Sequence, residues 1–414
     1  MFSMRDFAKA AKQASFQTAL LSEEIKNKTL TDMASALRET TADILKANEQ
    51  DIRSAKENQL SDAMIDRLLL TTDRVEDIAQ ALEQIATQAD PVGKIKNKQT
   101  MKNGLQVAKM SIPLGVIAMI FESRPNVTAD AAALCLKAGN AVILRGGKEA
   151  IHSSLAIAAA LHLALEKNGI SKAAISVVPD PDRKHLNELL TLTDSVDLII
   201  PRGGESLIHF VSDNSKIPVI QHYKGVCHLY VDKEADQDKA IKILLNGKVQ
   251  RPGVCNSLET FLVHQDIAEE FLVKAAKALN EFNVKVYACE RSIQYFDNVA
   301  PASDEEYDKE YLSLEIALRV VDSFEQAIEH ILKFSSGHTE VIVTENKQSA
   351  DLFIKSINSA VVMWNASSRF SDGGELGLGA EIGISTSKLH AYGPMGVESL
   401  TTEKFVVVGD GQVR

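Results

Sequence analysis

Apolar and polar residues follow a helical period over the first 90 residues. Segment 30–58 (LTDMASALRETTADILKANEQDIRSAKEN) places apolar residues three and four positions apart, with charged residues between them. Segment 73–90 repeats the pattern and stops before Pro91, and a proline disfavours helix at the residue before it. The chain is therefore predicted to begin with a helical region.

The pattern changes near residue 112, where short apolar runs begin to alternate with helical stretches. The predicted strands are 114–121, 141–145, 174–178, 196–200 and 217–221, and the predicted helices are 127–139, 148–167, 183–192 and 203–212. Strands and helices that alternate at this spacing indicate βαβ units and a parallel sheet with both faces covered. Ligands of such sheets bind at the carboxyl ends of the strands.

A second alternating block follows residue 228. Its predicted strands are 228–232, 258–264, 313–322, 340–345 and 360–365, and its predicted helices are 237–250, 266–282, 324–334 and 348–357. The remaining tail is rich in glycine up to GPMG and then resembles a strand from residue 404 onward. Two α/β blocks in one chain suggest an enzyme with a cleft.

Size and composition fit a soluble multidomain protein. The 414 residues are 45% apolar and 24% charged, which is ordinary for a globular chain with two or three domains. The net charge of −11 gives no long-range attraction to nucleic acid or to an anionic membrane. The apolar runs are too short to cross a bilayer, and the first residues carry scattered charges. We expect a cytoplasmic protein without nucleic-acid or membrane partners.

The four cysteines are Cys135, Cys227, Cys255 and Cys289. They are scattered without a CxxC pair, so no metal site is expected, and a reducing compartment argues against disulfides. Cys135 lies in an apolar helical stretch and is expected to fill space in the core. Cys255 stands in QRPGVCNSLET (250–260), where residue type alone leaves packing and nucleophilic chemistry both open.

The glycine fingerprint of dinucleotide-binding folds is missing. The nearest match is GLGAEIG (377–383), which has the wrong spacing and no evident turn from strand to helix, and which reads more simply as a loop.

Several long stretches together resemble the γ-glutamyl phosphate reductases, also called glutamate-5-semialdehyde dehydrogenases, of the aldehyde dehydrogenase superfamily. These stretches cover nearly the whole chain: LSDAMIDRLLLT (60–71), DPVG (90–93), GVIAMIFESRPNVTADAAALCLKAGNAVILRGGKEA (115–150), IIPRGGESLI (199–208), QRPGVCNSLET, and the tail from WNASSRFSDGG to GPMG (364–396). The cofactor domain of that superfamily lacks the glycine fingerprint, so its absence here does not argue against a dinucleotide.

The resemblance implies an aldehyde dehydrogenase-like α/β fold with two doubly wound domains and a small oligomerisation hairpin. An NADP-binding domain is expected over 1–227 with a return segment at about 362–393, and a catalytic domain over 228–361. Segments 100–112 and 394–414 would form the oligomerisation element of a homodimer or homotetramer.

The activity implied is the second step of proline biosynthesis. NADPH would reduce L-γ-glutamyl 5-phosphate to L-glutamate 5-semialdehyde and phosphate through a cysteine thioester. Association with glutamate 5-kinase, which makes the labile acyl phosphate, is a further expectation, although no residue pattern in this chain bears on it.

The resemblance gives Cys255 the role of nucleophile and Asn126, in SRPNVT, that of a side-chain donor to the acyl oxygen. Arg251 lies four residues before the cysteine and could favour its thiolate. The alternative for Asn126 is an ordinary turn position after a proline.

Basic and glycine residues at two strand ends would bind the cofactor. Two basic side chains near the adenosine ribose favour NADP over NAD, and glycines at a helix start suit the pyrophosphate. The alternative for the basic pair is ordinary solvation of a helix start. The implied residues are Arg145, Gly146, Gly147 and Lys148, then Arg202, Gly203, Gly204 and Glu205, and finally Glu310 at the nicotinamide ribose.

Arginines are the candidates for the anionic groups of the substrate, because their fork of N–H donors matches carboxylate and phosphate. Structural ion pairs are the competing interpretation. The substrate-binding residues expected are Arg124, His222, Arg251, Asn365, Ser367 and Arg369.

Two positions depart from related patterns. His222 stands where oxidative aldehyde dehydrogenases carry the glutamate that activates water, and Tyr392 stands where the reductases usually carry arginine. A missing hydrolytic base fits a reductase that must protect its thioester. The rivals are a phosphate-independent aldehyde dehydrogenase of the same fold and a catalytically silent homologue.

Overall fold

The computed structural model describes residues 2–414, apart from the side chain at position 63. The chain divides into two compact units, each described by itself below. The first comprises residues 1–221, 378–383 and 395–414, and the second comprises residues 222–377 and 384–394.

Five helices open the first unit, as the helical period predicts. Serine or threonine hydroxyls cap four of them by accepting a backbone N–H of the first turn. The long helical segment predicted over 30–58 is interrupted at Thr40, where one helix ends and the next begins. The helices are α1 (Met4–Thr18), α2 (Glu23–Glu39), α3 (Thr41–Glu57), α4 (Asp62–Leu68) and α5 (Thr72–Thr87).

A four-stranded parallel sheet in the order β5-β4-β3-β6 forms the centre of this unit. Every residue of β3 is buried, which accounts for its unbroken apolar run. The strands are β3 (Val116–Phe121), β4 (Ala141–Arg145), β5 (Ile175–Val177) and β6 (Leu198–Arg202), and the helices among them are α6 (Val127–Lys137), α7 (Ile151–Lys167), α8 (Arg183–Leu189) and α9 (Glu205–Asn214).

The prediction of a strand over 217–221 is wrong. This segment makes one isolated bridge, between Val219 and Ile199. Ile199 donates its N–H to Pro218 O and accepts from the N–H of Ile220, but Pro218 has no N–H with which to extend a ladder.

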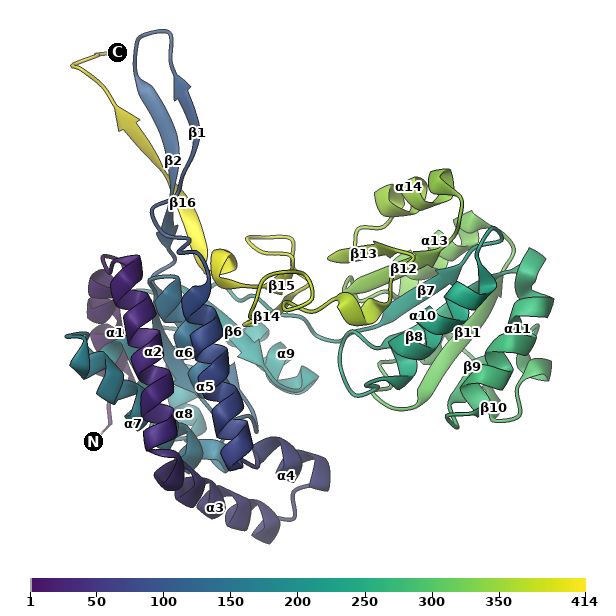
Figure 1. Cartoon of the computed structure of the whole chain (residues 1–414), viewed down its shortest axis with the longest axis horizontal. Helices are drawn as coiled ribbons and strands as arrows, with labels where there is room; N and C mark the ends of the chain where they lie inside the picture. The colour runs from purple at the N-terminus through teal and green to yellow at the C-terminus, as the bar shows by residue number, and fades with distance from the viewer. Residues whose placement is uncertain (1) are drawn as a thin grey trace. The chain divides into compact units, whose positions relative to one another are not determined.

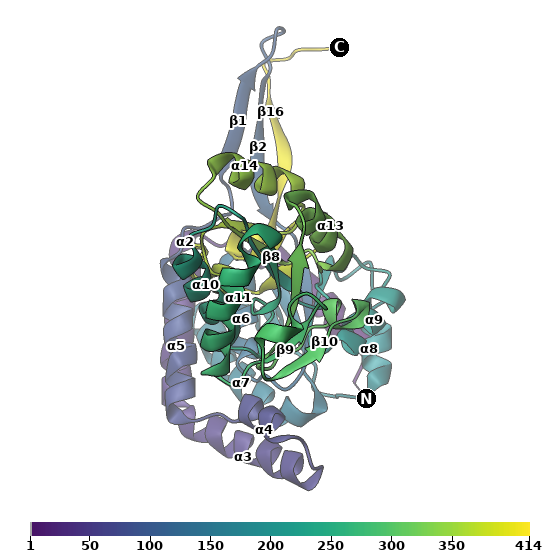
Figure 2. The same cartoon turned by 90° about the vertical axis from the view of Figure 1, so that its right-hand side faces the viewer.

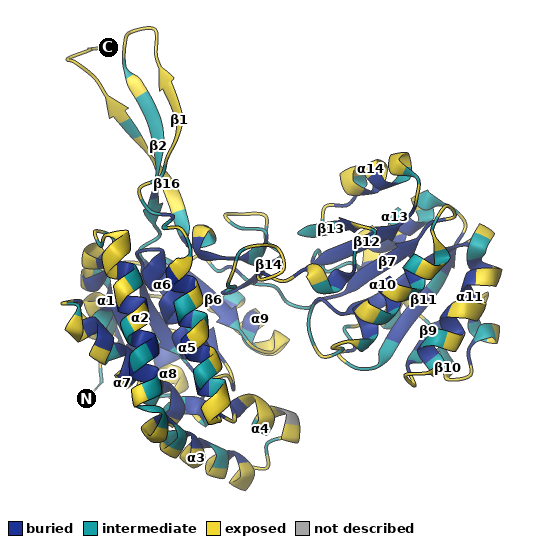
Figure 3. Ribbon diagram, viewed as in Figure 1, coloured by how far each residue is buried: buried dark blue, intermediate teal, exposed yellow. Residues whose placement is uncertain are grey.

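A three-stranded antiparallel sheet extends away from the helices of the first unit, at the opposite end from α3 and α4 (Figures 1 and 2). Its order is β1 (Ile95–Thr100), β2 (Gln106–Pro113) and β16 (Thr401–Val408), with β2 in the middle. Most of its residues are exposed or half-buried (Figure 3). The first strand begins at residue 95, before the start of the hairpin expected from 100 to 112.

The second unit is built on a seven-stranded parallel sheet in the order β10-β9-β11-β8-β7-β12-β13. The strands are β7 (Cys227–Val231), β8 (Leu258–His264), β9 (Lys285–Ala288), β10 (Val299–Pro301), β11 (Glu315–Val321), β12 (Thr339–Val343) and β13 (Val361–Trp364). The helices are α10 (Gln237–Val249), α11 (Gln265–Asn280), α12 (Asp304–Tyr307), α13 (Phe324–Phe334) and α14 (Lys347–Ser356). All residues of β7 and β8 are buried, and the cysteine loop lies directly before β8.

Residues 362–377 and 384–393 belong to this second unit, so of the return segment expected at about 362–393 only residues 378–383 lie in the first unit. The reason is that β13 pairs along its length with β12. The division after residue 221 also lies six positions before the expected one at 227. Which unit binds cofactor and which carries the chemistry remain predictions.

Short elements complete the chain. They are the 3₁₀ helices η1 (Lys148–Ala150), η2 (Lys172–Ala174), η3 (Ile293–Tyr295), η4 (Ser368–Phe370) and η5 (Val397–Leu400), and the strands β14 (Gly383–Ser385) and β15 (Gly393–Met395). Among residues 2–414, none of the helices is both long and apolar enough to cross a membrane.

Candidate active site

Cys255 lies in an irregular loop between α10 and β8 of the second unit. The segment around η4 holds this loop from one side. Ser368 Oγ donates to Asn256 O at 2.7 Å, and Asn256 Nδ2 donates to Ser371 O at 2.9 Å. Arg369 Nε reaches Gln250 Oε1 at 3.1 Å. Residues more than a hundred positions away therefore hold Asn256, directly after the cysteine, and the side chain of Gln250, five positions before it.

The backbone at Gly225 passes directly against the cysteine. A Cβ at position 225 would lie 2.1 Å from Cys255 O, a separation that no side chain tolerates. The thiol of Cys227 donates to the same carbonyl oxygen at 3.2 Å. The sequence analysis did not identify Gly225, although the glycine in KGVCH was the available signal.

The two cysteines of this region differ in exposure. Cys227 is fully buried, and burial raises the pKa of its thiol well above the usual range. Cys255 is partly exposed. Because the thiolate is the reactive form, Cys227 is suited to packing and to supporting the Cys255 carbonyl, not to attack.

Two guanidinium groups share the neighbourhood of Cys255. Burial and the positive charge of Arg251 lower the pKa of Arg369, and the Asp372 carboxylate and the Cys255 sulfur oppose this shift. These effects place Arg369 within electrostatic range of both Arg251 and the Cys255 thiol. Positive charge of this kind favours a thiolate.

A fully buried ion pair spans the cysteine loop. Lys248, in the last turn of α10, donates to Glu259 in β8 at 2.7 Å, and neither side chain is exposed to solvent. Burial raises the pKa of Glu259 to about 7 and lowers that of Lys248. Glu259 also accepts the N–H of Leu312 at 3.3 Å. This ion pair was not predicted from the sequence, although a glutamate inside the apolar run LETFLVH could have indicated a buried charge.

The segment before β11 also holds the loop at 222–226. Lys224 pairs with Asp308 at 2.7 Å, and Glu310 Oε1 accepts the N–H of Gly225 at 2.9 Å. Glu310 was predicted to bind the nicotinamide ribose, and in this structure its carboxylate positions the glycine beneath Cys255. The ribose contact stays a prediction.

His222 lies at the start of this loop with its ring centre 6.1 Å from that of His338. Burial and the charge of His222 lower the pKa of His338 to about 3, so His338 is neutral at physiological pH. Because residue 222 is a histidine, it brings no carboxylate to this loop.

Three further predicted positions take part in local structure. Asn365, in a left-handed conformation, accepts from Thr344 N and donates to Thr344 O, both at 3.0 Å. Ser367 caps η4 by accepting the N–H of Arg369 at 3.3 Å. The Tyr392 hydroxyl donates to Asn358 O. Substrate contacts of Asn365 and Ser367 remain predictions beside these observed roles.

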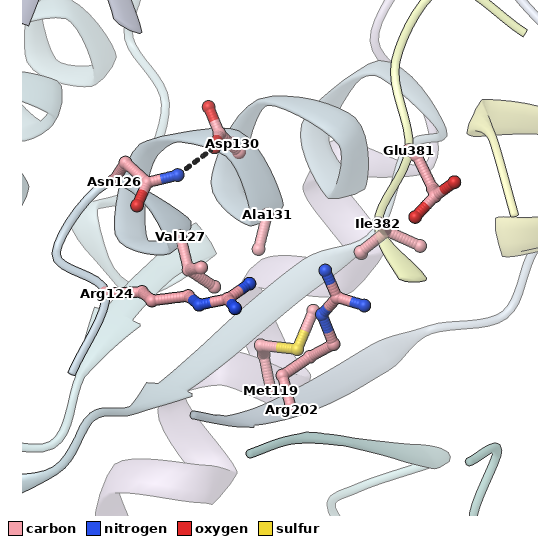
Figure 4. Close-up of a pocket in the computed structure, with 9 residues that line it drawn as sticks. All are labelled: Met119, Arg124, Asn126, Val127, Asp130, Ala131, Arg202, Glu381 and Ile382. Atoms are coloured by element: carbon pink, nitrogen blue, oxygen red, sulfur yellow. Dashed lines mark hydrogen bonds between the residues drawn. The ribbon is translucent and has the colours of Figure 1, made fainter. Parts of the chain in front are cut away.

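In the first unit, Asn126 lines a pocket at the start of α6 (Figure 4). Its Nδ2 donates to Asp130 Oδ2, one helical turn later, at 2.9 Å. The pocket residues come from β3 and the loop after it, α6, β6 and the loop before β14: Met119, Arg124, Asn126, Val127, Asp130, Ala131, Arg202, Glu381 and Ile382. Arg124 and Arg202 were predicted at separate sites, and the structure brings them together.

The predicted 2′-phosphate site lies at the end of β4. Lys148 is exposed there, while Arg145 is half-buried and donates to Pro181 O at 2.7 Å. Burial lowers the pKa of Arg145, and the nearby charge of Arg183 adds to the effect. Arg183 was not foreseen, because it follows a different strand, and it adds a third cation to this site.

The start of α9 already receives an anionic group. Glu122 Oε2 accepts the N–H of Gly204 at 3.0 Å and lies 2.5 Å from where a Cβ of Gly203 would stand. A carboxylate in this place indicates that the N–H donor and the two glycines suit an anion, as the predicted pyrophosphate site requires. The Gly204 N–H therefore donates to an anionic group here, and the pyrophosphate contact stays a prediction.

Metal ligands do not gather anywhere in the described part of the chain. Within residues 2–414, His, Cys, Asp and Glu side chains form no group of three or more that could hold a metal ion.

Comparisons with known proteins agree with this picture. The model of the aldehyde dehydrogenase family matches residues 3–293. A γ-glutamyl phosphate reductase of Idiomarina loihiensis is 61% identical, over 99% of this chain and 98% of the relative. The chain belongs to the γ-glutamyl phosphate reductases of the aldehyde dehydrogenase family.

Other γ-glutamyl phosphate reductases extend the comparison. The relative from Colwellia psychrerythraea is 57% identical over 100% of this chain and 99% of the relative. The crystal structure of a γ-glutamyl phosphate reductase from Thermotoga maritima superposes with a TM-score of 0.98 at 41% identity, covering 100% of both chains. As a member of this family the chain is an oxidoreductase, and the predicted family and fold class are confirmed.

Proposed function

We propose that this enzyme uses NADPH to reduce L-γ-glutamyl 5-phosphate to L-glutamate 5-semialdehyde and phosphate, the second step of proline biosynthesis. The supporting observation is Cys255, a partly exposed thiol within electrostatic range of Arg369 and four positions after Arg251, in a chain of the γ-glutamyl phosphate reductase family.

Cys255 acts as the nucleophile in this proposal. Its thiolate attacks the acyl carbon, the bond to phosphate breaks, and phosphate leaves with the electron pair to give a thioester. Bound NADPH supplies the hydride that reduces this thioester carbonyl. The resulting hemithioacetal collapses with loss of the Cys255 thiolate, which regains its original state as the aldehyde leaves.

Two kinds of group stabilise the charges of these steps. Arg251 and Arg369 favour the thiolate before attack. The amide of Asn126 has two N–H donors, one of which is taken by Asp130. Its second donor is assigned to the acyl oxygen, where one fixed donor is worth about 3 kcal/mol in the transition state.

The cofactor would be held by the first unit. Lys148 and Arg183, beside Arg145, supply positive charge for a 2′-phosphate and favour NADPH over NADH. The start of α9 would bind the pyrophosphate once the Glu122 carboxylate withdraws from Gly204.

His222 explains why the thioester would be reduced and not hydrolysed. Oxidative relatives use a carboxylate at the position predicted for His222 to activate water. The variant His222→Glu should release glutamate from γ-glutamyl phosphate without consuming NADPH. An unchanged ratio of glutamate released to NADPH oxidised, in a folded and active variant, would show that residue 222 does not face the thioester.

A homodimer or homotetramer is part of the same proposal. β16 is an edge strand with Phe405 70% and Val407 55% exposed, and an exposed apolar edge is suited to pairing with another copy. Sedimentation of the wild type and of Phe405→Glu would test it, because an oligomer should dissociate in the variant.

The deciding experiment for the activity runs the reaction backwards. The protein is incubated with NADP and glutamate 5-semialdehyde, with and without phosphate, and NADPH formation is followed by absorbance. Formation only with phosphate supports the proposal. Formation without phosphate would identify a hydrolytic aldehyde dehydrogenase, and none in either condition would indicate a catalytically silent homologue.

A further inference from the structure

The helix α6 is buried along its whole length except at one position. Every residue from Val127 to Lys137 is buried apart from Asp130, which lines the pocket at the start of the helix (Figure 4). This pocket encloses about 350 Å³, part of which is open to solvent. The one acidic side chain of α6 therefore faces the pocket and not the apolar core.

The partner of Asp130 is the side-chain amide of Asn126. The two residues are four positions apart, a spacing that places side chains on the same face of a helix. Asn126 Nδ2 donates to Asp130 Oδ2 at 2.9 Å, and Figure 4 shows the amide nitrogen turned toward the carboxylate and the amide oxygen turned away from it. The carboxylate thus selects which end of the amide lies beside it.

An ionised carboxylate can fix this orientation because it accepts hydrogen bonds and donates none. An amide has two N–H donors at one end and an acceptor oxygen at the other, and turning it over exchanges the two ends. With Asp130 charged, only the nitrogen end can bond to it, and the second N–H is directed elsewhere. In the opposite orientation the amide oxygen would take the place of that N–H and repel an acyl oxygen that gains negative charge.

The charged groups around the pocket determine when Asp130 is ionised. Asp130 keeps some contact with solvent, yet the protein around it raises its pKa to about 6, while the Asn126 amide and the charge of Arg202 act in the opposite direction. Arg124 and Glu381 also line the pocket, carry opposite charges and have interactions of their own. The carboxylate is therefore charged at neutral pH and gains a proton as the pH falls through about 6.

We propose that Asp130 is a positioning residue, whose carboxylate fixes the Asn126 amide in the orientation that presents an N–H to the acyl oxygen. This assignment rests on the proposed function, in which that N–H stabilises the transition state, and it adds the group on which the donor depends. The competing role is structural, because a carboxylate in the first turn of a helix stabilises the helix by itself. The two roles predict different responses to substitution.

Two substitutions of Asp130 separate these roles. Asp130→Asn keeps the shape of the side chain but introduces N–H donors, which can bond to the Asn126 oxygen and hold the Asn126 amide in the wrong orientation. The charge of Arg202, which already acts on this position, attracts the oxygen of the new amide and favours that arrangement. Asp130→Ala removes donor and acceptor together, so the Asn126 amide can turn freely.

Asp130→Asn should lower kcat for the phosphate-dependent oxidation of glutamate 5-semialdehyde at least about tenfold, because most of the contribution of the Asn126 donor is lost. Asp130→Ala should lower kcat only about two- to threefold, since a freely turning amide still presents its donor part of the time. KM for NADP should change in neither variant. The control Asp213→Asn, which changes an exposed aspartate near the end of α9, should leave kcat unchanged.

Urea unfolding midpoints of all variants are measured beside the rates. If Asp130 only supported α6, the truncation to alanine would harm the enzyme more than the change to asparagine, which keeps the shape. A greater loss of kcat in Asp130→Ala than in Asp130→Asn would therefore overturn the proposal, as would full activity in both variants.

A double-mutant cycle shows whether Asp130 acts through Asn126. In the background of Asn126→Ala, adding Asp130→Asn should change kcat by less than about twofold, because no donor remains to be misplaced. An equal loss of kcat with and without the Asn126 side chain would contradict the proposal.

The pH dependence tests the role of the charge. The ratio of wild-type kcat to Asp130→Asn kcat should be greatest above neutral pH and should decrease as the pH falls through about 6, because the protonated carboxyl can donate to the amide and no longer fixes it. Groups that titrate in both proteins cancel from this ratio. A ratio that stays constant across this range would overturn the proposal. Each outcome differs from failure of the proposed function, in which the wild type would form no NADPH in the presence of phosphate.

Discussion

The Cys255 loop and the Asn126 segment are carried by two different kinds of backbone. Asn126 stands at the first turn of a regular helix, a few residues after the fully buried strand β3. Cys255 stands in a loop without regular hydrogen bonding, fixed by residues of three distant segments, 224–227, 308–312 and 367–371. The regular helix and strand position Asn126, whereas the position of Cys255 depends on contacts made by individual residues.

The two sites should therefore respond differently to substitutions in the residues around them. At Asn126 the helix keeps the backbone in place when the side chain is changed, so a substitution should affect mainly the chemistry and the one hydrogen bond to Asp130. Around Cys255 the geometry rests on Gly225, Glu259, Ser368 and their partners, so changes at residues that never touch substrate should disturb the thiol. Four substitutions test the comparison, beginning with the largest expected effect.

Cys255→Ala should abolish turnover and leave NADPH binding intact, because the thiol serves chemistry and not cofactor affinity. Cys227→Ala should keep most activity, since the Cys227 thiol is buried with a raised pKa and only supports a carbonyl. Steady-state rates and NADPH fluorescence titrations measure both. An inactive Cys227→Ala beside an active Cys255→Ala would reverse the assignment.

Lys248→Met should lower the free energy of unfolding of the second unit by about 3–5 kcal/mol, because it leaves the Glu259 carboxylate buried without its partner. Urea unfolding followed by tryptophan fluorescence reports on this unit through Trp364, the one tryptophan of the chain. The double variant Lys248→Met/Glu259→Leu should recover much of the loss. A single variant as stable as the wild type would mean that the pair does not hold the loop.

Asn126→Ala should lower kcat about 10²-fold, close to 3 kcal/mol, and lower the free energy of unfolding by less than Lys248→Met does, because Asp130 loses one neutral hydrogen bond. The amide donates to Asp130 on its own helix and makes no capping bond there. Rates and urea midpoints are compared with those of Asn126→Asp, which keeps the shape and loses the donor. A loss of stability as large as that of Lys248→Met would remove the contrast between the two regions.

Glu122→Gln should tighten NADPH binding about two- to fivefold, the smallest effect of the four. It removes a negative charge from the start of α9, where such charges are worth about 0.3–1 kcal/mol, and so removes a competitor of the pyrophosphate. Fluorescence titration measures the affinity, with Asp213→Asn, which changes an exposed aspartate near the other end of α9, as the control. Weaker binding in Glu122→Gln would show that the carboxylate assists the cofactor.

Much of the fold could be read from the sequence, because buried parallel strands such as β3, β4 and β8 are continuous apolar runs. The strands β9 and β10 escaped detection, since runs of four and three residues are too short to show a periodic pattern. A strand was wrongly predicted over 217–221, because the apolar residues of this segment suggest a strand although Pro218 has no backbone N–H to donate.

The candidate site residues were predicted mainly from the resemblance, since residue type alone did not decide the roles of Cys255 and Asn126. What no pattern could supply was proximity. Arg124 and Arg202 are 78 positions apart and meet only because β3 and β6 are neighbours in the sheet. The Lys248–Glu259 pair was hidden for the same reason, because a charge in an apolar run has no visible partner until the chain is folded.

The position of β16 also has a consequence for how the chain is made. Its partner strand β2 leaves the ribosome early, but Ser111 and Thr401, whose hydroxyl groups are hydrogen-bonded to each other between the two strands, are separated by 290 positions. At a synthesis rate of 5–20 residues per second, β2 waits roughly 15 to 60 s with one edge unpaired. The second unit is almost complete before that wait ends. During synthesis the chain is therefore most vulnerable to wrong strand pairing at the edge of β2 that β16 later covers.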